Sequence, residues 1–296
     1  MTSTPVPGPT GLRSMRDVAG APPGGPVALL NRDLAEKALA LVDHIRSMCP
    51  VVVAFSGGID SSLLLAAAFE ACEGKVLAIT ASSATYPRRE LDRAREIARM
   101  IGAELQVLRT REMEDPAFRL NPLDRCYHCK RELFLKVKRE AEDGGYRAVL
   151  EGSTVDDLGD FRPGERASRE LEVISPLRQL GFSKSDVREL ARSIGLPNWD
   201  KPAAACLASR FPYGTEITRE ALSRLERVED AMHDLGFGQV RARYHGELLR
   251  LEVEPAKIEL AALPETRDKI VQCARKEGFR FVTIDLQGYR TGSFNP

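Results

Sequence analysis

The sequence predicts an α/β protein with a doubly wound parallel sheet, followed by a smaller C-terminal α+β domain. Short β-branched segments alternate with amphipathic helical segments between residues 31 and 194, which is the pattern of parallel βαβ units. Beyond a proline-rich interruption at 197–212, the order changes to helix, strand, strand, helix and strand. The 296 residues are enough for two domains of ordinary size.

The first strand–loop–helix unit follows an N-terminal helix. Asn31 is a favourable helix N-cap, and apolar residues then recur at helical spacing from Leu34 to Ile45. The segment VVVAF at 51–55 is a β-branched run typical of a buried parallel strand. A Gly-Gly turn and the apolar segment 61–71 predict a loop and a helix.

The same alternation continues along the chain. Strands are predicted at β-branched segments, and helices at segments whose apolar residues recur every three or four positions. One helix opens with a proline and another with a capping serine. The predicted strands are 75–80, 104–108, 147–152 and a short one ending near Ile174, and the predicted helices are 87–101, 130–142 and 183–194.

The chain divides into three predicted parts. Residues 1–26 are rich in proline and glycine and cannot bury enough surface to offset chain entropy, so they are predicted to be a disordered leader. Residues 27–210 form the parallel-sheet domain. Residues 211–296, from a junction near Phe211, form an α+β domain that is expected to bind substrate or to make oligomer contacts. Its predicted elements are a helix at 218–235, strands at 239–244, 248–253 and 281–286, and a helix ending near Glu277.

Composition and charge argue against several classes of protein. Lysine and arginine number 43 and aspartate and glutamate also number 43, so no net positive field attracts nucleic acid or an anionic membrane. No apolar run approaches the roughly 20 residues that span a bilayer, and the N-terminus shows no apolar segment with a small-residue cleavage site. We therefore expect a cytoplasmic protein with neither a membrane nor a nucleic-acid partner.

The strongest single motif is SGGIDSS at 56–62, between a predicted buried strand and a helix start. Paired glycines let backbone amides point into one concavity, the hydroxyls add donors, and the helix N-terminus adds positive potential, so the loop suits a phosphate group. The motif lacks the GKS or GKT of a Walker A loop. Asp60 lies inside the loop, where a carboxylate can recruit Mg²⁺ to a pyrophosphate. An ordinary strand-to-helix turn is the alternative.

This motif resembles the PP-loop of the N-type ATP pyrophosphatases, which cleave ATP between the α and β phosphates. The resemblance implies an adenine nucleotide alpha hydrolase-like fold and a reaction that leaves an AMP ester on the substrate. It also implies that Thr80 and Ser82, at the end of the second strand, face the adenine. The residues implied to hold pyrophosphate are Ser56, Gly57, Gly58, Asp60, Ser61 and Ser62.

Further blocks make the resemblance narrower. Together, and in this order, they resemble the LarE family of ATP-dependent sulfur transferases, which build the nickel-pincer nucleotide cofactor of lactate racemase. The resemblance covers residues 34–253, which is nearly all of the chain expected to be ordered. The blocks are RCYHCK at 125–130, EGSTVDD at 151–157, DFRPG at 160–164, SPL at 175–177, WDKPAAACLASRFPYG at 199–214 and VRARYHG at 240–246.

Three of the six cysteines suggest chemistry. Cys126 and Cys129 form a C-x-x-C at a predicted helix start, and Cys206 precedes the second domain. The pair alone leaves zinc, a redox disulfide and chance open. Three thiolates suit a [4Fe-4S] cluster with one iron open to an extra sulfide, and a zinc site completed by His128 is the alternative. The remaining cysteines are expected to pack in the core: Cys49, Cys72 and Cys273.

The family resemblance implies two possible sources of sulfur. One form of the family uses a single cysteine that surrenders its sulfur and becomes dehydroalanine, and Cys206 matches that cysteine within its ACLASR block. The other form carries a cluster on three cysteines. The presence of Cys126 and Cys129 favours the cluster form.

Basic and acidic residues of the second domain are candidates for substrate binding. Arg241 and Arg243 share one face of a predicted strand, because side chains alternate along it, and Arg210 flanks the junction. Guanidinium groups suit phosphate and carboxylate, and a solvated face is the alternative. In the resembling family, arginines of the second domain bind the substrate's phosphate. Glu229 and Glu252 lie where the family places acidic metal-binding positions.

We therefore expect an enzyme that binds Mg-ATP, adenylates a carboxylate of a pyridinium dicarboxylate mononucleotide, releases pyrophosphate and replaces the activated oxygen with sulfur. A bare carboxylate does not accept a sulfide nucleophile, whereas AMP is a good leaving group. An external sulfide donor and a homo-oligomer are also expected. The alternatives are a cluster-dependent tRNA-thiolating PP-loop enzyme, an ammonia-using PP-loop amidotransferase and a nucleotide-binding regulatory module without catalysis.

Overall fold

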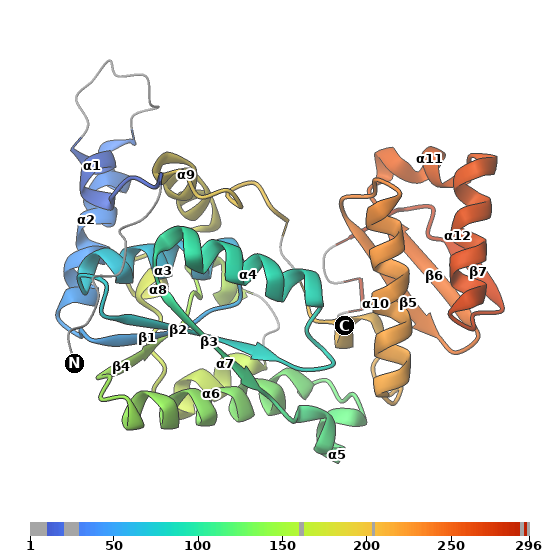
Figure 1. Ribbon diagram of the computed structural model, residues 1–296, viewed down its shortest axis with the longest axis horizontal. Coiled ribbons are helices and arrows are strands. Elements are labelled where there is room, and N and C mark those ends of the chain that lie inside the picture. Colours follow the sequence, from blue (N-terminus) through green and yellow to red (C-terminus); the bar gives the residue numbers. More distant parts are fainter. Residues whose placement is uncertain (1–10, 21–29, 160–162, 203–204, 291–292, 295–296) are drawn as a thin grey trace. The chain divides into compact units, whose positions relative to one another are not determined.

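The computed structural model describes residues 11–20, 30–159, 163–202, 205–290 and 293–294 (Figure 1). The chain divides into two compact units, which we describe separately. None of the helices in the described ranges combines the length and the apolar character that a membrane span requires. Unit 1 comprises the described residues of 1–82, 88–110 and 126–204, and unit 2 those of 83–87, 111–125 and 205–296.

Unit 1 is built around a four-stranded parallel sheet, which confirms the predicted α/β class. The chain runs outward from β1 to β2 and β3 and then returns to the other side of β1 for β4. The loops after β1 and β4 therefore meet where the winding reverses, and ligands of open parallel sheets bind at that point. The strand order is β3 (Glu104–Arg109), β2 (Val76–Ser82), β1 (Val51–Ala54) and β4 (Ala148–Leu150), with every neighbouring pair parallel.

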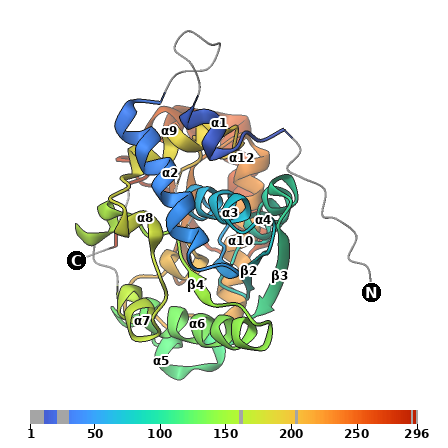
Figure 2. The same ribbon diagram turned by 90° about the vertical axis from the view of Figure 1, so that its left-hand side faces the viewer.

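Helices cover both faces of this sheet (Figures 1 and 2). Val51 and Val53 of β1 belong to one apolar core, and Val52 belongs to a second core on the opposite face. Both faces of β1 are thus buried, which explains its unbroken β-branched sequence. The first core contains residues of α2 (Arg32–Arg46), α3 (Ile59–Ala71), α4 (Arg88–Ile101) and α9 (Lys184–Ile194), and the second contains residues of α6 (Arg125–Asp143) and α7 (Gly164–Glu170).

Most element boundaries lie close to the predicted ones, because the local signals are strong. The Asn31 side chain accepts a hydrogen bond from the Leu34 amide, and Ser183 forms a capping box with Asp186. The predicted strand near Ile174 is reduced to a single bridge with Leu150. Short elements in polar segments were not predicted: the 3₁₀ turns η1 (Glu112–Glu114) and η2 (Val155–Gly159) and the helices α5 (Pro116–Arg119), α7 and α8 (Pro176–Gln179).

The predicted disordered leader contains a short helix, α1 (Met15–Ala19). Its first turn is closed by a capping box between Ser14 and Asp17, and Met15 and Val18 are buried in the core that also contains α2. Burial of these two apolar side chains stabilises the helix, although the segment as a whole is rich in proline and glycine. Residues 1–10 and 21–26 of the predicted leader lie outside the described residues.

Cys49 and Cys72 form a disulfide, whereas the sequence led us to expect two packed thiols. Cys49 follows α2, and Cys72 is the residue after the last turn of α3. Their Cα atoms are 5.5 Å apart across a sequence separation of 23 residues. Packing of α2 beside α3 brings the two together, and their spacing along the chain gives no sign of it.

Unit 2 is a small α+β structure, as predicted, and the sheet and helices of its part after residue 205 are orange and red in Figure 1. In its three-stranded sheet, β5 and β6 are antiparallel, and β6 and β7 are parallel. The helix α10 packs against β5 and against α12. The elements are η3 (Leu207–Arg210), α10 (Arg219–Asp234), β5 (Val240–His245), β6 (Leu248–Val253), η4 (Pro255–Lys257), α11 (Ile258–Ala262), α12 (Pro264–Lys276) and β7 (Phe281–Ile284).

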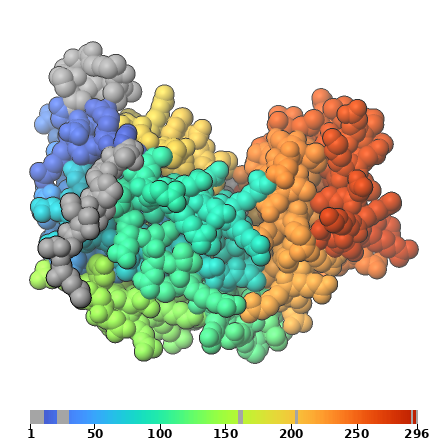
Figure 3. Space-filling view, in the orientation of Figure 1, coloured from blue at the N-terminus to red at the C-terminus, as the bar shows by residue number. Residues whose placement is uncertain are grey.

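The division between the units differs from a single break near Phe211. Residues 83–87 and 111–125 belong to unit 2, because backbone and side-chain hydrogen bonds fasten them to the segment that starts at residue 205. The Leu207 amide donates to the Thr85 carbonyl over 2.8 Å, and the Asn121 side chain donates to the Pro212 carbonyl over 2.7 Å. The segment 83–87 follows β2, and the segment 111–125 follows β3; we call these two segments the excursions of the chain into unit 2. The helix α4, which lies between β2 and β3 in the sequence, is at the surface of unit 1 in Figure 3.

Candidate active site

The SGGIDSS loop connects β1 to α3, as predicted, and the backbone requires the first of its two glycines. Gly57 has a φ of +68°, a conformation that residues with a side chain rarely adopt. A Cβ atom on Gly57 would also lie 3.0 Å from the Cα and Cβ atoms of Ala94 on α4. Gly58 is the N-cap of α3, so the first amides of that helix border the loop.

Side chains fasten this loop in one conformation. The hydroxyls of Ser61 and Ser62 donate to the Gly58 carbonyl over 3.0 and 2.8 Å, and the Ser56 and Ser61 hydroxyls are 3.0 Å apart. Asn198 lies 136 positions beyond Ser62, and its Nδ2 donates to the Ser62 hydroxyl over 3.1 Å and to the Gly57 carbonyl over the same distance. Asn198 was not predicted as a site residue, because no local motif surrounds it.

The Asp60 carboxylate is paired with a lysine. Lys184, the first residue of α9, has its Nζ 2.6 Å from Asp60 Oδ2 and 3.3 Å from the carboxylate of Asp157. Asp157 follows β4, so residues from three elements meet at the reversal point of the sheet. A carboxylate in this loop, next to a cation, fits the coordination of Mg²⁺ on a polyphosphate. Lys184 was predicted only as part of a helix start.

Glu151, at the end of β4, is a buried carboxylate close to the loop. It accepts hydrogen bonds from Lys130 Nζ at 2.9 Å, from Ser153 at 3.1 Å and from Ser175 at 3.2 Å. Burial disfavours its charge, but the ion pair with Lys130 and the hydrogen bonds outweigh burial and lower the pKa of Glu151. Lys130 is the residue after Cys129, so this ion pair ties the cysteine-bearing helix to the sheet edge.

Gly152 lets β4 approach the phosphate loop. A Cβ atom there would lie 2.9 Å from the Ser61 amide nitrogen and 3.1 Å from the Ser61 Cα. Any side chain at this position would push the backbone of the loop. On the other side of β1, Thr80 is a buried residue of β2, and Ser82, the last residue of that strand, is half-buried.

Cys126 and Cys129 lie in the first turn of α6, three residues apart, which places them on the same side of the helix. Cys126 is exposed and Cys129 is half-buried. Cys206 belongs to unit 2, where it is the N-cap of η3. Within the described residues, no three His, Cys, Asp or Glu side chains are gathered so as to hold a metal ion. The paired thiols of α6 fit two of the ligands of an iron–sulfur cluster.

The predicted arginines and acidic residues of unit 2 pair with one another. Arg210 forms a two-bond ion pair with Glu229, with distances of 2.8 and 2.7 Å, and Glu229 also accepts from the Ala242 amide. Arg243 pairs with Glu252 at 2.6 Å. All four side chains are buried, so a solvated face is excluded for them. Burial disfavours the charged form of Glu229, but the Arg210 charge and the hydrogen bonds outweigh burial, so the pKa of Glu229 is lowered.

Arg241 occupies a different environment on the same strand face. Its guanidinium lies 5.0 Å from the ring centroid of Tyr289. Burial, together with the nearby Arg210 charge, lowers the pKa of Arg241.

Comparison with known proteins identifies the family. A family model described as asparagine synthase matches residues 32–158. An uncharacterised protein of Synechocystis sp. is 41% identical over 244 residues, which are 82% of this chain and 91% of that protein. The pyridinium-3,5-bisthiocarboxylic acid mononucleotide synthase of Lactiplantibacillus plantarum is 36% identical over 263 residues, 88% of this chain and 95% of that protein. The chain belongs to the LarE family.

An archaeal relative extends the comparison. An uncharacterised protein of Methanocaldococcus jannaschii is 30% identical over 243 residues, which are 81% of this chain and 91% of that protein. Membership in the LarE family confirms the resemblance seen in the sequence and the PP-loop fold that it implied. It likewise confirms the expectation of an ATP-dependent sulfurtransferase.

Proposed function

We propose that this LarE protein adenylates a carboxylate of a pyridinium dicarboxylate mononucleotide, releases pyrophosphate and converts the activated carboxylate to a thiocarboxylate for a nickel-pincer cofactor. The observation that carries the proposal is the SGGIDSS loop at the reversal point of the sheet, in a chain 36% identical to a protein named for this product. Activation by AMP makes the carboxylate oxygen a leaving group that sulfide can replace.

The phosphate end of ATP has a defined place in this proposal. The loop amides at the start of α3 and the hydroxyls of Ser61 and Ser62 border the pyrophosphate, and Asp60 approaches the Mg²⁺. Lys184 holds Asp60 in place and adds positive charge beside the leaving pyrophosphate. Thr80 and Ser82, on β2, border the adenine.

The sulfur is assigned to three cysteines. Cys126 and Cys129 on α6, with Cys206 of unit 2, would hold a [4Fe-4S] cluster, and the paired thiols of α6 fit such a group. When bound, the cluster supplies sulfide to the activated carboxylate. An external donor then replenishes the sulfide. The alternative is a route in which Cys206 gives up its own sulfur.

The substrate's phosphate is assigned to the arginines of unit 2. Arg241 and Arg243 project from one face of β5. Arg210 forms its ion pair with Glu229. Glu229 and Glu252 position these guanidinium groups, and either would serve a metal ion only by giving up its arginine. A homo-oligomer and a cytoplasmic location complete the proposal.

One assay tests the function. The protein is incubated anaerobically with Mg-ATP, sulfide and the pyridinium dicarboxylate mononucleotide, and pyrophosphate and the nucleotide product are measured. We expect pyrophosphate release that depends on the nucleotide and a product in which sulfur replaces a carboxylate oxygen. Pyrophosphate release that instead requires tRNA or ammonia, or no release at all, would overturn the proposal.

A further inference from the structure

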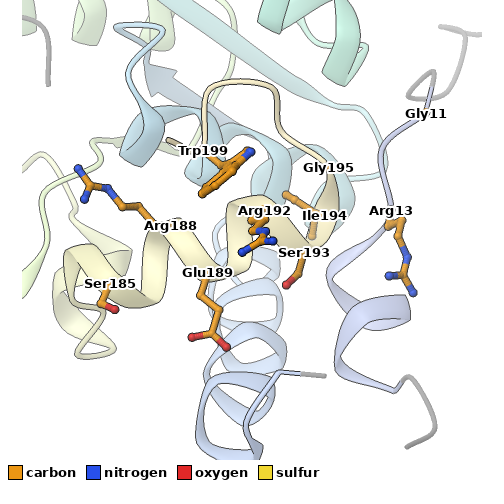
Figure 4. Close-up of a pocket in the computed structure, with 10 residues that line it drawn as sticks. All are labelled: Gly11, Arg13, Ser185, Arg188, Glu189, Arg192, Ser193, Ile194, Gly195 and Trp199. Atoms are coloured by element: carbon orange, nitrogen blue, oxygen red, sulfur yellow. The ribbon is translucent and has the colours of Figure 1, made fainter. Parts of the chain in front are cut away.

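A cavity lies along α9 in unit 1. Its volume is about 650 Å³, and it is lined by residues of α9 between Ser185 and Ile194, by the N-terminal segment that precedes α1 and by Trp199 (Figure 4). The Arg13 amide donates to the Ile194 carbonyl over 3.0 Å and so closes one side of the cavity. None of the described residues that line this cavity belongs to the phosphate loop at 56–62.

The lining carries an excess of positive charge. It contains Arg13, Arg188 and Arg192 against one carboxylate, Glu189, whose side chain extends away from the indole in Figure 4. Arg188 and Arg192 are exposed and lie four residues apart on α9, so both project from the same side of that helix. Arg13 Nη1 is buried, and among the described residues nothing accepts a hydrogen bond from it.

The cavity also offers an aromatic surface. Trp199 is half-buried, and the Arg192 guanidinium lies 4.9 Å from the centroid of its ring (Figure 4). Indole rings are strong platforms for stacking nucleobases, and an arginine over such a ring adds a cation–π contact. An inorganic anion would use the arginines alone, whereas an aromatic phosphate uses both features. A volume of about 650 Å³ is within the usual range for small-molecule sites.

We propose that this cavity binds a nucleotide, distinct from the ATP of the phosphate loop, with its base against Trp199 and its phosphate on the surrounding arginines. The site is independent of the sulfur chemistry proposed above. Its occupant also has a route to the active site, because Trp199 follows Asn198, which donates hydrogen bonds to Gly57 and Ser62 of the phosphate loop.

The chain contains a single tryptophan, so the indole emission of the protein comes from Trp199, which lines this cavity. The wild-type protein is titrated with AMP and, separately, with inorganic phosphate. We expect AMP to change the emission of Trp199 saturably, and inorganic phosphate to need at least tenfold higher concentration. A phosphate midpoint equal to that of AMP would overturn the assignment to a nucleotide.

Variants separate this cavity from the phosphate loop, whose occupancy can also reach Trp199 through Asn198. We expect Arg188→Ala/Arg192→Ala and Arg13→Ala each to weaken the AMP response at least tenfold while circular dichroism stays unchanged. The matched control is Arg139→Ala, an exposed arginine of α6 with 84% side-chain exposure, which should respond like wild type.

Measuring the number of AMP molecules bound per chain tests the proposal without using fluorescence. In equilibrium dialysis with labelled AMP, the Arg188→Ala/Arg192→Ala protein should bind one fewer equivalent per chain than wild type and than Arg139→Ala. Equal stoichiometry and equal affinity in all three proteins would overturn the proposal, whatever the emission of Trp199 does.

Discussion

Asp60 is the only carboxylate of the phosphate loop, and Lys184 contacts it from a helix far along the chain. Asp60→Asn removes the negative charge that Mg²⁺ requires and leaves Lys184 paired with Asp157. We expect this variant to fold normally and to lose nearly all ATP-dependent pyrophosphate release. The measurement is a pyrophosphate assay with circular dichroism as the check on folding.

The lysine permits a second variant with a matched control. Lys184→Met should lower pyrophosphate release in the same assay, because Asp60 and Asp157 lose their shared cation. Lys37→Met removes a similar lysine, which pairs with Asp186 at 3.1 Å near the start of α9 but does not touch the loop. Wild-type release by Lys184→Met, or an equal loss in Lys37→Met, would contradict the role given to Lys184.

Glu151 makes the stability of the protein depend on pH in a defined window. Its folded pKa lies below the unfolded value of about 4.3, so the stabilisation is complete above that value and is lost as pH falls through the folded pKa. Glu151→Gln should lower the free energy of unfolding at pH 7 by about 1 to 3 kcal/mol. The difference from wild type should shrink below pH 4 or so.

Urea unfolding at several pH values between 3.5 and 7 measures this dependence. Glu142→Gln serves as control, because Glu142 is exposed on the same helix that carries Lys130, and it should change nothing. A wild-type advantage over Glu151→Gln that stays constant down to pH 3.5 would show that Glu151 acts through packing alone.

At the scale of elements, the packing of β4 against the start of α3 sets the shape of the phosphate loop. Gly152→Ala places a Cβ atom 2.9 Å from the Ser61 amide nitrogen, so the backbone of the loop must shift. We expect ATP affinity to fall at least tenfold, measured by calorimetry. Gly145→Ala is the control: its φ of +72° makes that variant strained by about 1 kcal/mol, with no atom near the new Cβ.

These two glycine variants distinguish a local effect from general destabilisation. Gly145→Ala should lower the melting temperature and keep the ATP affinity of wild type. If both variants lose ATP affinity in proportion to their loss of stability, the contact between Gly152 and Ser61 has no special part in binding.

The Cys49–Cys72 disulfide joins the end of α2 to the end of α3. In denaturant without reductant, alkylation of the metal-free protein should label four thiols, and with reductant it should label six. Cys49→Ala/Cys72→Ala should be less stable by about 2 to 4 kcal/mol and insensitive to reductant. Labelling of all six thiols without reductant would show that the pair is reduced.

At the scale of the whole molecule, the proposed cluster is assigned to Cys126, Cys129 and Cys206. If they hold it, anaerobically purified protein is expected to be brown, with roughly four iron atoms and four sulfides per chain. Cys126→Ala, Cys129→Ala and Cys206→Ala should each be colourless, and Cys273→Ala, altered on α12, should keep the colour. Ultraviolet–visible spectra with iron and sulfide analysis measure this.

The intact mass of the chain after turnover identifies the source of sulfur. If the cluster route operates, the mass stays unchanged. A loss of about 34 Da, located at Cys206, would show that this cysteine gives up its sulfur. A colourless, iron-free preparation that still transfers sulfur would refute the cluster assignment.

The sequence by itself predicted the features that depend on neighbours along the chain. β-branched runs and helical periodicity predicted the strands β1 to β7 and most of the longer helices, because each pattern reflects local backbone geometry. The SGGIDSS loop was predicted as a phosphate site for the same reason: its glycines, hydroxyls and helix start are contiguous. The blocks around Cys126 and Cys206 sufficed for the family.

Only the tertiary structure decided which distant residues meet. Lys184 reaches Asp60 across 124 positions and Asn198 reaches Gly57 across 141, and no pattern along the chain encodes those pairs. The same is true of the Arg210–Glu229 ion pair, the excursions at 83–87 and 111–125 and the helix α1. Local propensity is a short-range property, whereas burial, charge pairing and disulfide formation depend on how the elements pack.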